Sequence, residues 1–107
     1  MLDLSPTDRV LVFPSGDGTL CRELAARVPL GLVVGLDPSD ENVRTARVAA
    51  RDIDNIMFVC ADLSEIPWNA HFFSVALIPE STTDRKEVER VMAEGGRVVA
   101  ILGGSLH

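Results

Sequence analysis

Two glycines separate an apolar run from a segment with helical spacing, within residues 10–20 (VLVFPSGDGTL). Gly16 and Gly18 let the backbone turn tightly and let a ligand approach it where a Cβ would intrude. A helix that begins here has unpaired N–H groups and a partial positive charge at its start, which suit an anionic group. The segment therefore predicts either a ligand-binding turn or an ordinary structural turn, since glycine is common in loops.

Acidic residues follow the next two apolar runs. Asp37 comes about 20 residues after the glycine turn, where an acid in nucleotide-binding folds accepts hydrogen bonds from both ribose hydroxyls. Aspartate is also a usual residue at a helix entry such as Asp37-Pro38-Ser39. Asp62 follows the third run. Because parallel strands end at one edge of a sheet, the turn and both acids are expected to share that edge, where open α/β sheets bind ligands.

Apolar runs alternate several times with segments of helical periodicity. Strands are expected at residues 9–13, 30–36, 56–60, 72–78 and 97–102, and helices at about 20–28, 39–51 and 83–94. Ser39 is placed to cap the second helix, Asp40 and Arg44 are placed to pair along it, and Gly95 is placed to end the third.

This alternation predicts the fold class: an α/β protein with a doubly wound, mostly parallel, five-stranded Rossmann-like sheet in the order 3-2-1-4-5. Residues 61–71, between the third and fourth strands, are few for a parallel crossover. In extended form they can pass over the sheet, but they cannot include a long helix. We therefore expect that face of the sheet to be thinly covered.

The hydrophobic content, net charge and cysteine spacing of the chain exclude several classes of protein. The 107 residues are 47% hydrophobic and carry a net charge of -6, which predicts one soluble domain over residues 1–107, in the cytoplasm. The acidic balance argues against nucleic-acid partners, and no apolar run reaches the roughly 18 residues of a membrane helix. Cys21 and Cys60 form no CxxC pair, so we expect two buried thiols, without a disulfide scaffold or a metal site.

Four segments, in this order, resemble the motifs of class I S-adenosylmethionine-dependent methyltransferases over residues 9–104. VLVFPSGDG is similar to the glycine motif of that family, VVGLDPSDENVRTAR to its second motif and VCADLSEIPW to its third. The segment MAEGGRVVAI is similar to the glycine turn and fifth strand of the family. The resemblance implies a domain that binds S-adenosylmethionine and transfers its methyl group to a small-molecule or protein acceptor.

The resemblance also implies a set of cofactor-binding residues. The turn residues would line the methionine end of the cofactor, Asp37 would hold the ribose hydroxyls, and Asp62 would meet the adenine amino group. The full set is Ser15, Gly16, Asp17, Gly18, Asp37, Pro38, Asp62, Leu63 and Ile78. No catalytic residue is assigned, because a positioned acceptor needs none. His71, Glu80 and Asp84 are candidate general bases. The alternative interpretation of each is a structural or surface role.

The chain departs from the family pattern in three places. Val12 stands where an acid is usual, Pro14 stands where the first glycine is common, and we expect the sheet to lack the usual C-terminal antiparallel hairpin. An exposed fifth strand is a liability for a monomer, so we expect a homodimer or a partner subunit at that edge. Two other functions stay open: an inactive binding or assembly module, and a nicotinamide-dinucleotide domain, in which Cys21 would replace the third glycine.

Overall fold

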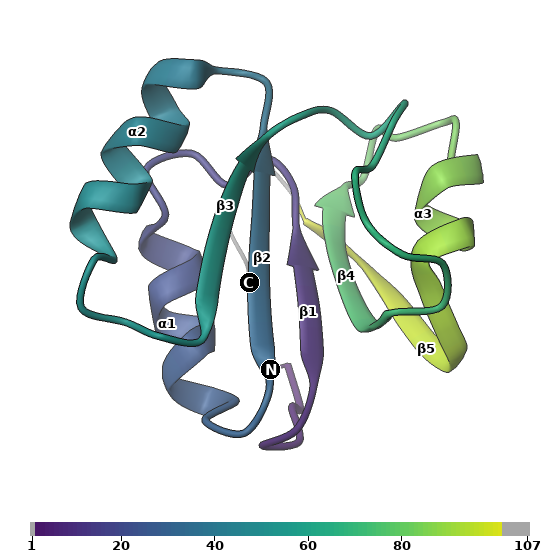
Figure 1. The fold of residues 1–107 in the computed structure, drawn as a ribbon. Coiled ribbons are helices and arrows are strands. Elements are labelled where there is room, and N and C mark those ends of the chain that lie inside the picture. Colours follow the sequence, from purple (N-terminus) through teal and green to yellow (C-terminus); the bar gives the residue numbers. More distant parts are fainter. Residues whose placement is uncertain (1, 102–107) are drawn as a thin grey trace.

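A computed structural model describes residues 2–101 of the chain. Strands and helices alternate along most of it (Figure 1), and one pair of strands follows in succession without a helix between them. The elements are β1 (Arg9–Val12), α1 (Thr19–Arg27), β2 (Leu32–Asp37), α2 (Asp40–Ala49), β3 (Ile56–Cys60), β4 (Phe73–Pro79), α3 (Lys86–Val91) and β5 (Met92–Ile101).

The five strands form one sheet in the order β3-β2-β1-β4-β5, and every neighbouring pair is parallel. At its centre, Leu11 of β1 lies opposite Val34 of β2 on one side and Ala76 of β4 on the other. These central strands are buried on both faces, which explains their continuous apolar runs. The predicted fold class and strand order are confirmed.

Successive residues of β1 face opposite layers of the core. Val10 and Val12 pack with Leu24 of α1 and Val43 of α2. Leu11 packs into a second cluster, with Val88 of α3. Helices α1 and α2 therefore cover one face of the sheet and α3 covers part of the other (Figure 1).

Helix α2 has the N-terminal cap and the ion pair that the sequence predicts. The Ser39 hydroxyl accepts a hydrogen bond from the Asn42 N–H at 3.1 Å and so caps the helix. Asp40 and Arg44 form an ion pair at 3.1 Å. The helix ends at Ala49, two residues before its predicted end at Arg51.

The third helix is shorter than predicted. It spans only Lys86–Val91, where residues 83–94 were expected, and β5 starts at once with Met92 opposite Phe73. Two amides of the β3–β4 link, those of His71 and Phe72, donate to the last helical carbonyls, those of Arg90 and Val91. These hydrogen bonds and the pairing of Met92 with β4 thus end the helix earlier than predicted. Gly95, expected to end it, lies inside β5 with φ +80°, near a shift in the β4–β5 register.

The link between β3 and β4 contains no helix, as predicted. It nevertheless covers the sheet, because Ile66 is buried and Trp68 packs against the rings of Phe72 and Phe73 at centroid distances of 5.7 and 5.9 Å. The link and α3 together cover this face of the sheet. The sequence had predicted that the face would be thinly covered.

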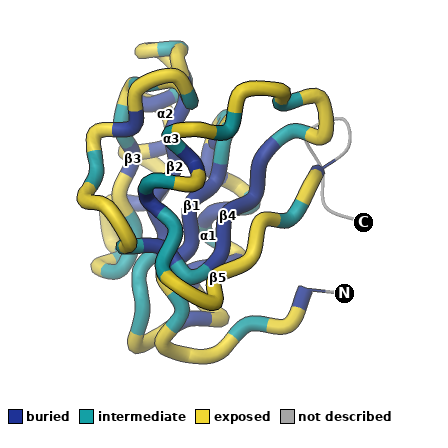
Figure 2. The backbone as a smooth tube through the Cα atoms, turned by 90° about the vertical axis from the view of Figure 1, so that its right-hand side faces the viewer, coloured by how far each residue is buried: buried dark blue, intermediate teal, exposed yellow. Residues whose placement is uncertain are grey.

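One cysteine differs from its prediction. Cys21 is buried, and this burial raises the pKa of its thiol to about 12. Cys60 is exposed, because it ends the edge strand β3. Figure 2 shows that the other edge strand, β5, is also exposed over most of its length. Within residues 2–101, the helices are too short or too polar to cross a membrane.

Candidate functional site

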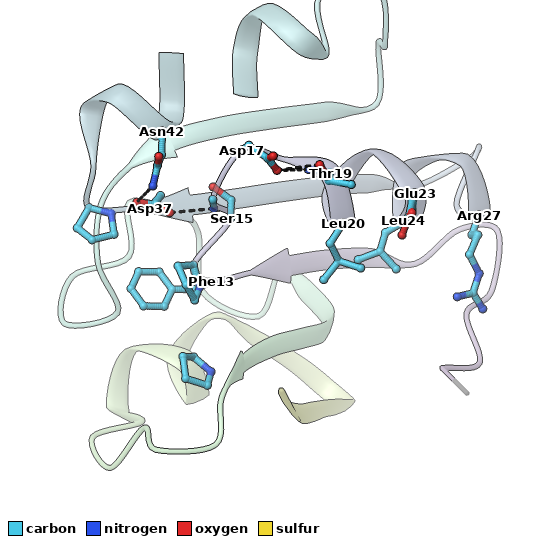
Figure 3. Close-up of a pocket in the computed structure, with 14 residues that line it drawn as sticks. Phe13, Ser15, Asp17, Thr19, Leu20, Glu23, Leu24, Arg27, Asp37 and Asn42 are labelled. Carbon is cyan, nitrogen blue, oxygen red and sulfur yellow. Dashed lines mark hydrogen bonds between the residues drawn. The ribbon is translucent and has the colours of Figure 1, made fainter. Parts of the chain in front are cut away.

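A cavity of about 950 Å³ opens where β1 and β2 end and continues beside α1 (Figure 3). Five of the residues predicted for cofactor binding line it: Ser15, Gly16, Asp17, Asp37 and Pro38. The remaining lining residues are Phe13, Pro14, Thr19, Leu20, Glu23, Leu24, Arg27, Asn42 and Pro79. The structure therefore brings the glycine turn and the acid at the end of β2 into one cavity.

Both turn glycines have left-handed backbone angles, with φ +56° at Gly16 and +84° at Gly18. A Cβ on Gly18 would lie 2.8 Å from Phe58 Cζ and 3.0 Å from Ala46 Cβ, so this residue lets α1 pack closely. A Cβ on Gly16 would meet no atom within 4 Å. The backbone of Gly16 is therefore open to a ligand in the cavity.

Asp37 connects the glycine turn to the start of α2. The residue is only 3% exposed. Oδ2 accepts a hydrogen bond from the Gly16 N–H at 2.9 Å, and Oδ1 accepts from the Ser39 N–H at 2.9 Å and from the Asn42 amide at 3.4 Å. A carboxylate has about four acceptor positions, so one remains, and the long Asn42 contact is the easiest to replace.

Ser15 supplies a polar atom that has no partner. Its backbone N–H donates to the Leu36 carbonyl at 2.8 Å, which fixes the turn against β2. The side chain is 7% exposed, and its Oγ has no hydrogen-bond partner within the described residues. Most buried polar atoms are satisfied, so an unpartnered hydroxyl in a cavity wall indicates a place for a polar ligand.

Asp17 places a negative charge at the mouth of the cavity. Its Oδ1 accepts hydrogen bonds from the Thr19 N–H at 3.0 Å and from the Thr19 hydroxyl at 2.8 Å. These bonds, the backbone one first, lower the pKa of this exposed carboxyl below its ordinary 3.8. Val12, by contrast, is buried in the core and does not reach the cavity.

Four predicted cofactor residues do not line this cavity. Gly18 is buried and forms the left-handed N-cap of α1. Asp62 is exposed, and its carboxylate accepts hydrogen bonds from the Ser64 hydroxyl and N–H, which lower its pKa. Leu63 packs half-buried, and Ile78 is buried in the core cluster on the α3 face. A cofactor role for these residues stays a prediction.

The three candidate general bases also lie outside the cavity. His71 and Glu80 are exposed, and the His71 ring contacts the Met92 carbonyl at 3.3 Å. Asp84 accepts a hydrogen bond from the Lys86 N–H at 3.1 Å, at the start of α3. The carboxylates that do line the cavity are those of Asp17, Glu23 and Asp37.

Sequence reasoning missed the α1 side of the cavity. Leu20, Glu23, Leu24 and Arg27 all line it and follow an i, i+3, i+4, i+7 spacing, which is one face of a helix. That spacing is the signal in the sequence that could have identified this side of the cavity. In residues 2–101, no group of three or more His, Cys, Asp or Glu is placed to hold a metal ion.

The site occurs in a fold shared with several solved structures. A putative S-adenosylmethionine-dependent methyltransferase from Methanococcus maripaludis superposes with a TM-score of 0.80 at 22% identity, over 92% of this chain and 49% of that one. Geranyl diphosphate C-methyltransferase from Streptomyces coelicolor, solved with S-adenosyl-L-homocysteine, gives a TM-score of 0.81 at 18% identity, over 94% and 41%.

A third structure is a complex between the Haloferax volcanii Trm112 methyltransferase activator and a putative methyltransferase. It gives a TM-score of 0.72 at 26% identity, over 85% of this chain and 43% of that one. The chain thus spans less than half of the length of all three. Among curated protein sequences, none matches it.

Family membership rests on a comparison that covers nearly the whole chain. The sequence profile of the methyltransferase domain family matches residues 10–103. This span includes the glycine turn, Asp37, Asp62 and the five strands apart from Arg9, the first residue of β1. The chain therefore belongs to the methyltransferase domain family, as its resemblance to class I S-adenosylmethionine-dependent methyltransferases predicted.

Proposed function

We propose that the chain binds S-adenosylmethionine in the cavity beside the glycine turn and serves as the cofactor domain of a methyltransferase. One observation carries the proposal: the unpartnered Ser15 hydroxyl, the open Gly16 backbone and the Asp37 carboxylate meet in one cavity. When bound, the cofactor supplies an electrophilic methyl group carried on a sulfonium.

Asp37 is the residue best placed to hold a ribose. Gly16 and Ser39 fix both of its oxygens, so the carboxylate is oriented before a ligand arrives. Its free acceptor position, and the one that the Asn42 amide occupies at 3.4 Å, leave room for two hydroxyl donors. Ser15 and Asp17 are then the polar groups for the amino-acid end of the cofactor, with Asp17 remaining ionised at neutral pH.

Binding of the cofactor tests this function directly. Calorimetric titration should show micromolar affinity for S-adenosylmethionine and S-adenosylhomocysteine and none for NAD. Ser15→Ala should weaken binding about fivefold, because one hydrogen bond contributes about 1 kcal/mol. Ser81→Ala, in an exposed turn, is the matched control and should leave the affinity unchanged. Absence of binding would favour the inactive module, and binding of NAD alone would favour a dinucleotide domain.

We also propose that β5 forms a contact with a second copy of the chain or with another subunit. The strand lies at the edge of the sheet, and its residues 94–98 are exposed, including Val98 at 37%. Val98 is the apolar side chain among these residues, which also include Glu94 and Arg97, and the unpaired backbone of an edge strand favours association. The Haloferax volcanii complex with an activator protein is one similar structure that was solved together with a partner.

A further inference from the structure

The Asn42 side chain lies where the proposed ribose site meets α2. In Figure 3 it extends from the first turn of that helix toward Asp37, and it lines the same cavity. The backbone of Asn42 is fixed, because its N–H donates to the Ser39 hydroxyl at 3.1 Å. The side chain is less constrained, since its amide makes one hydrogen bond within residues 2–101. A change of rotamer can therefore move the amide while α2 stays in place.

That one hydrogen bond is the weakest of the three at the Asp37 carboxylate. Asn42 Nδ2 lies 3.4 Å from Asp37 Oδ1, whereas N–H···O bonds normally span about 2.7–3.2 Å. The Gly16 and Ser39 N–H groups both reach the same carboxylate at 2.9 Å. These two backbone donors orient Asp37 without help from the amide. A ligand that is a better donor can therefore replace the Asn42 contact.

A hydroxyl group suits the position that the Asn42 amide would leave. A hydroxyl donates one hydrogen bond and can accept two, whereas a carboxylate only accepts. If a hydroxyl donates to Asp37, its oxygen still needs a donor, because Asp37 is 3% exposed and water has little access there. The Asn42 amide has two N–H donors and lies beside this position. Asp37 and Asn42 together therefore fit a group that donates to one and accepts from the other.

We propose that Asn42 is a specificity-determining residue of the cofactor site. Its amide leaves Asp37 to one ribose hydroxyl and then donates a hydrogen bond to the oxygen of that hydroxyl. The other ribose hydroxyl takes the acceptor position of Asp37 that is already free. Asn42 thereby recognises one of the two hydroxyls and adds to the selection of ribose over deoxyribose. This inference rests on the proposed function, because it takes the ribose of the cofactor as the ligand.

Three nucleosides test the two hydroxyls separately: adenosine, 2′-deoxyadenosine and 3′-deoxyadenosine. NMR titration of the full chain measures their affinities, with S-adenosylhomocysteine as the complete ligand. Asn42→Ala should weaken adenosine binding about fivefold, equivalent to about 1 kcal/mol, the contribution of one hydrogen bond. The same variant should weaken one of the two deoxyadenosines by the same factor. The other deoxyadenosine lacks the recognised hydroxyl, so its affinity should not change.

A purely structural role of Asn42 predicts a different pattern. If the amide only shapes the start of α2, Asn42→Ala should weaken the three nucleosides equally. Equal weakening, or no weakening of adenosine, would overturn the proposal. Asn42→Asp places an acceptor where the amide has a donor, so it should weaken adenosine at least as much, and unimpaired binding would also overturn the proposal. Glu41→Ala, at the exposed neighbouring position of the same turn, is the matched control and should change no affinity.

The same titrations keep this inference apart from the proposed function. Binding of S-adenosylhomocysteine, with nucleoside affinities that do not depend on Asn42, would remove the role of Asn42 and leave the cofactor site intact. Binding of the nucleosides in the expected pattern without S-adenosylhomocysteine would keep that role and remove the methyltransferase function. If none of the four ligands binds, both proposals fail.

Discussion

Asp37 combines a structural role with its proposed role in the site, because its carboxylate joins the glycine turn to the start of α2. Asp37→Ala should therefore lower the free energy of unfolding by about 1–3 kcal/mol, since the Gly16 and Ser39 N–H groups lose their acceptor. Urea unfolding measures this change. The exposed Asp40→Ala should cost less than about 1 kcal/mol. Equal losses for both variants would contradict the role given to Asp37.

The two cysteines should differ sharply in reactivity. Thiolates are the reactive form, and burial raises the pKa of Cys21 to about 12 from 9.0, while Cys60 is exposed. Iodoacetamide at pH 8 should therefore label one thiol per folded chain, and mass spectrometry should locate it at Cys60. Cys60→Ser should abolish labelling until denaturant is added. Rapid labelling of Cys21 in the folded Cys60→Ser variant would show that α1 opens.

At the scale of elements, α3 holds the β3–β4 link through two charged side chains. Glu87 Oε1 accepts from the Ile66 N–H at 2.9 Å, and Arg90 donates to the carbonyls of Ile66 and Trp68 at 2.7 and 2.9 Å. Glu87→Ala should speed hydrogen exchange of the Ile66 amide severalfold, as measured by NMR. Glu89→Ala, on the exposed side of the same helix, is the control. Unchanged exchange at Ile66 would mean that packing alone holds the link.

The same contact predicts a pH dependence. The hydrogen bond from Arg90 holds the pKa of Glu87 below its ordinary 4.5. An acid with a lowered pKa stabilises the fold above its ordinary value, and this contribution is lost as the pH falls through the folded-state pKa. Between pH 5 and pH 3, unfolding free energies should therefore fall less steeply for Glu87→Gln than for the unmodified chain. If the unfolding free energies of the two proteins fall equally steeply with pH, Glu87 is not a source of acid sensitivity.

At the scale of the whole molecule, the exposed β5 edge predicts association. Sedimentation at micromolar concentration should give a mass above that of one 11.6 kDa chain, or show the chain bound to a partner. Val98→Lys, which adds a charge to the exposed edge, should shift a dimer toward monomer. A single monomeric species for the unmodified chain would contradict the self-association.

The sequence by itself determined the order of elements, the fold class and the part of the cavity formed by the glycine turn and Asp37. Continuous Val and Leu runs mark strands buried on both faces, and Ser39 marks the start of α2 through its own side chain. The glycine turn and Asp37 were predicted to meet because parallel strands end at one edge, and they do line one cavity. These are local or topological properties, which pattern and spacing encode.

Only the tertiary structure decided the rest. Helix α3 ends at Val91 because amides of the β3–β4 link bind its last carbonyls and because the next residue, Met92, pairs with β4. Local helix propensity carries no information about these tertiary contacts. Cys60 is exposed because β3 lies at an edge. The cavity continues along α1 because the packing of the other elements leaves the space beside Leu20 and Arg27 open. A helix face has the same spacing whether it meets a core or a cavity, so only the arrangement of its neighbours distinguishes the two.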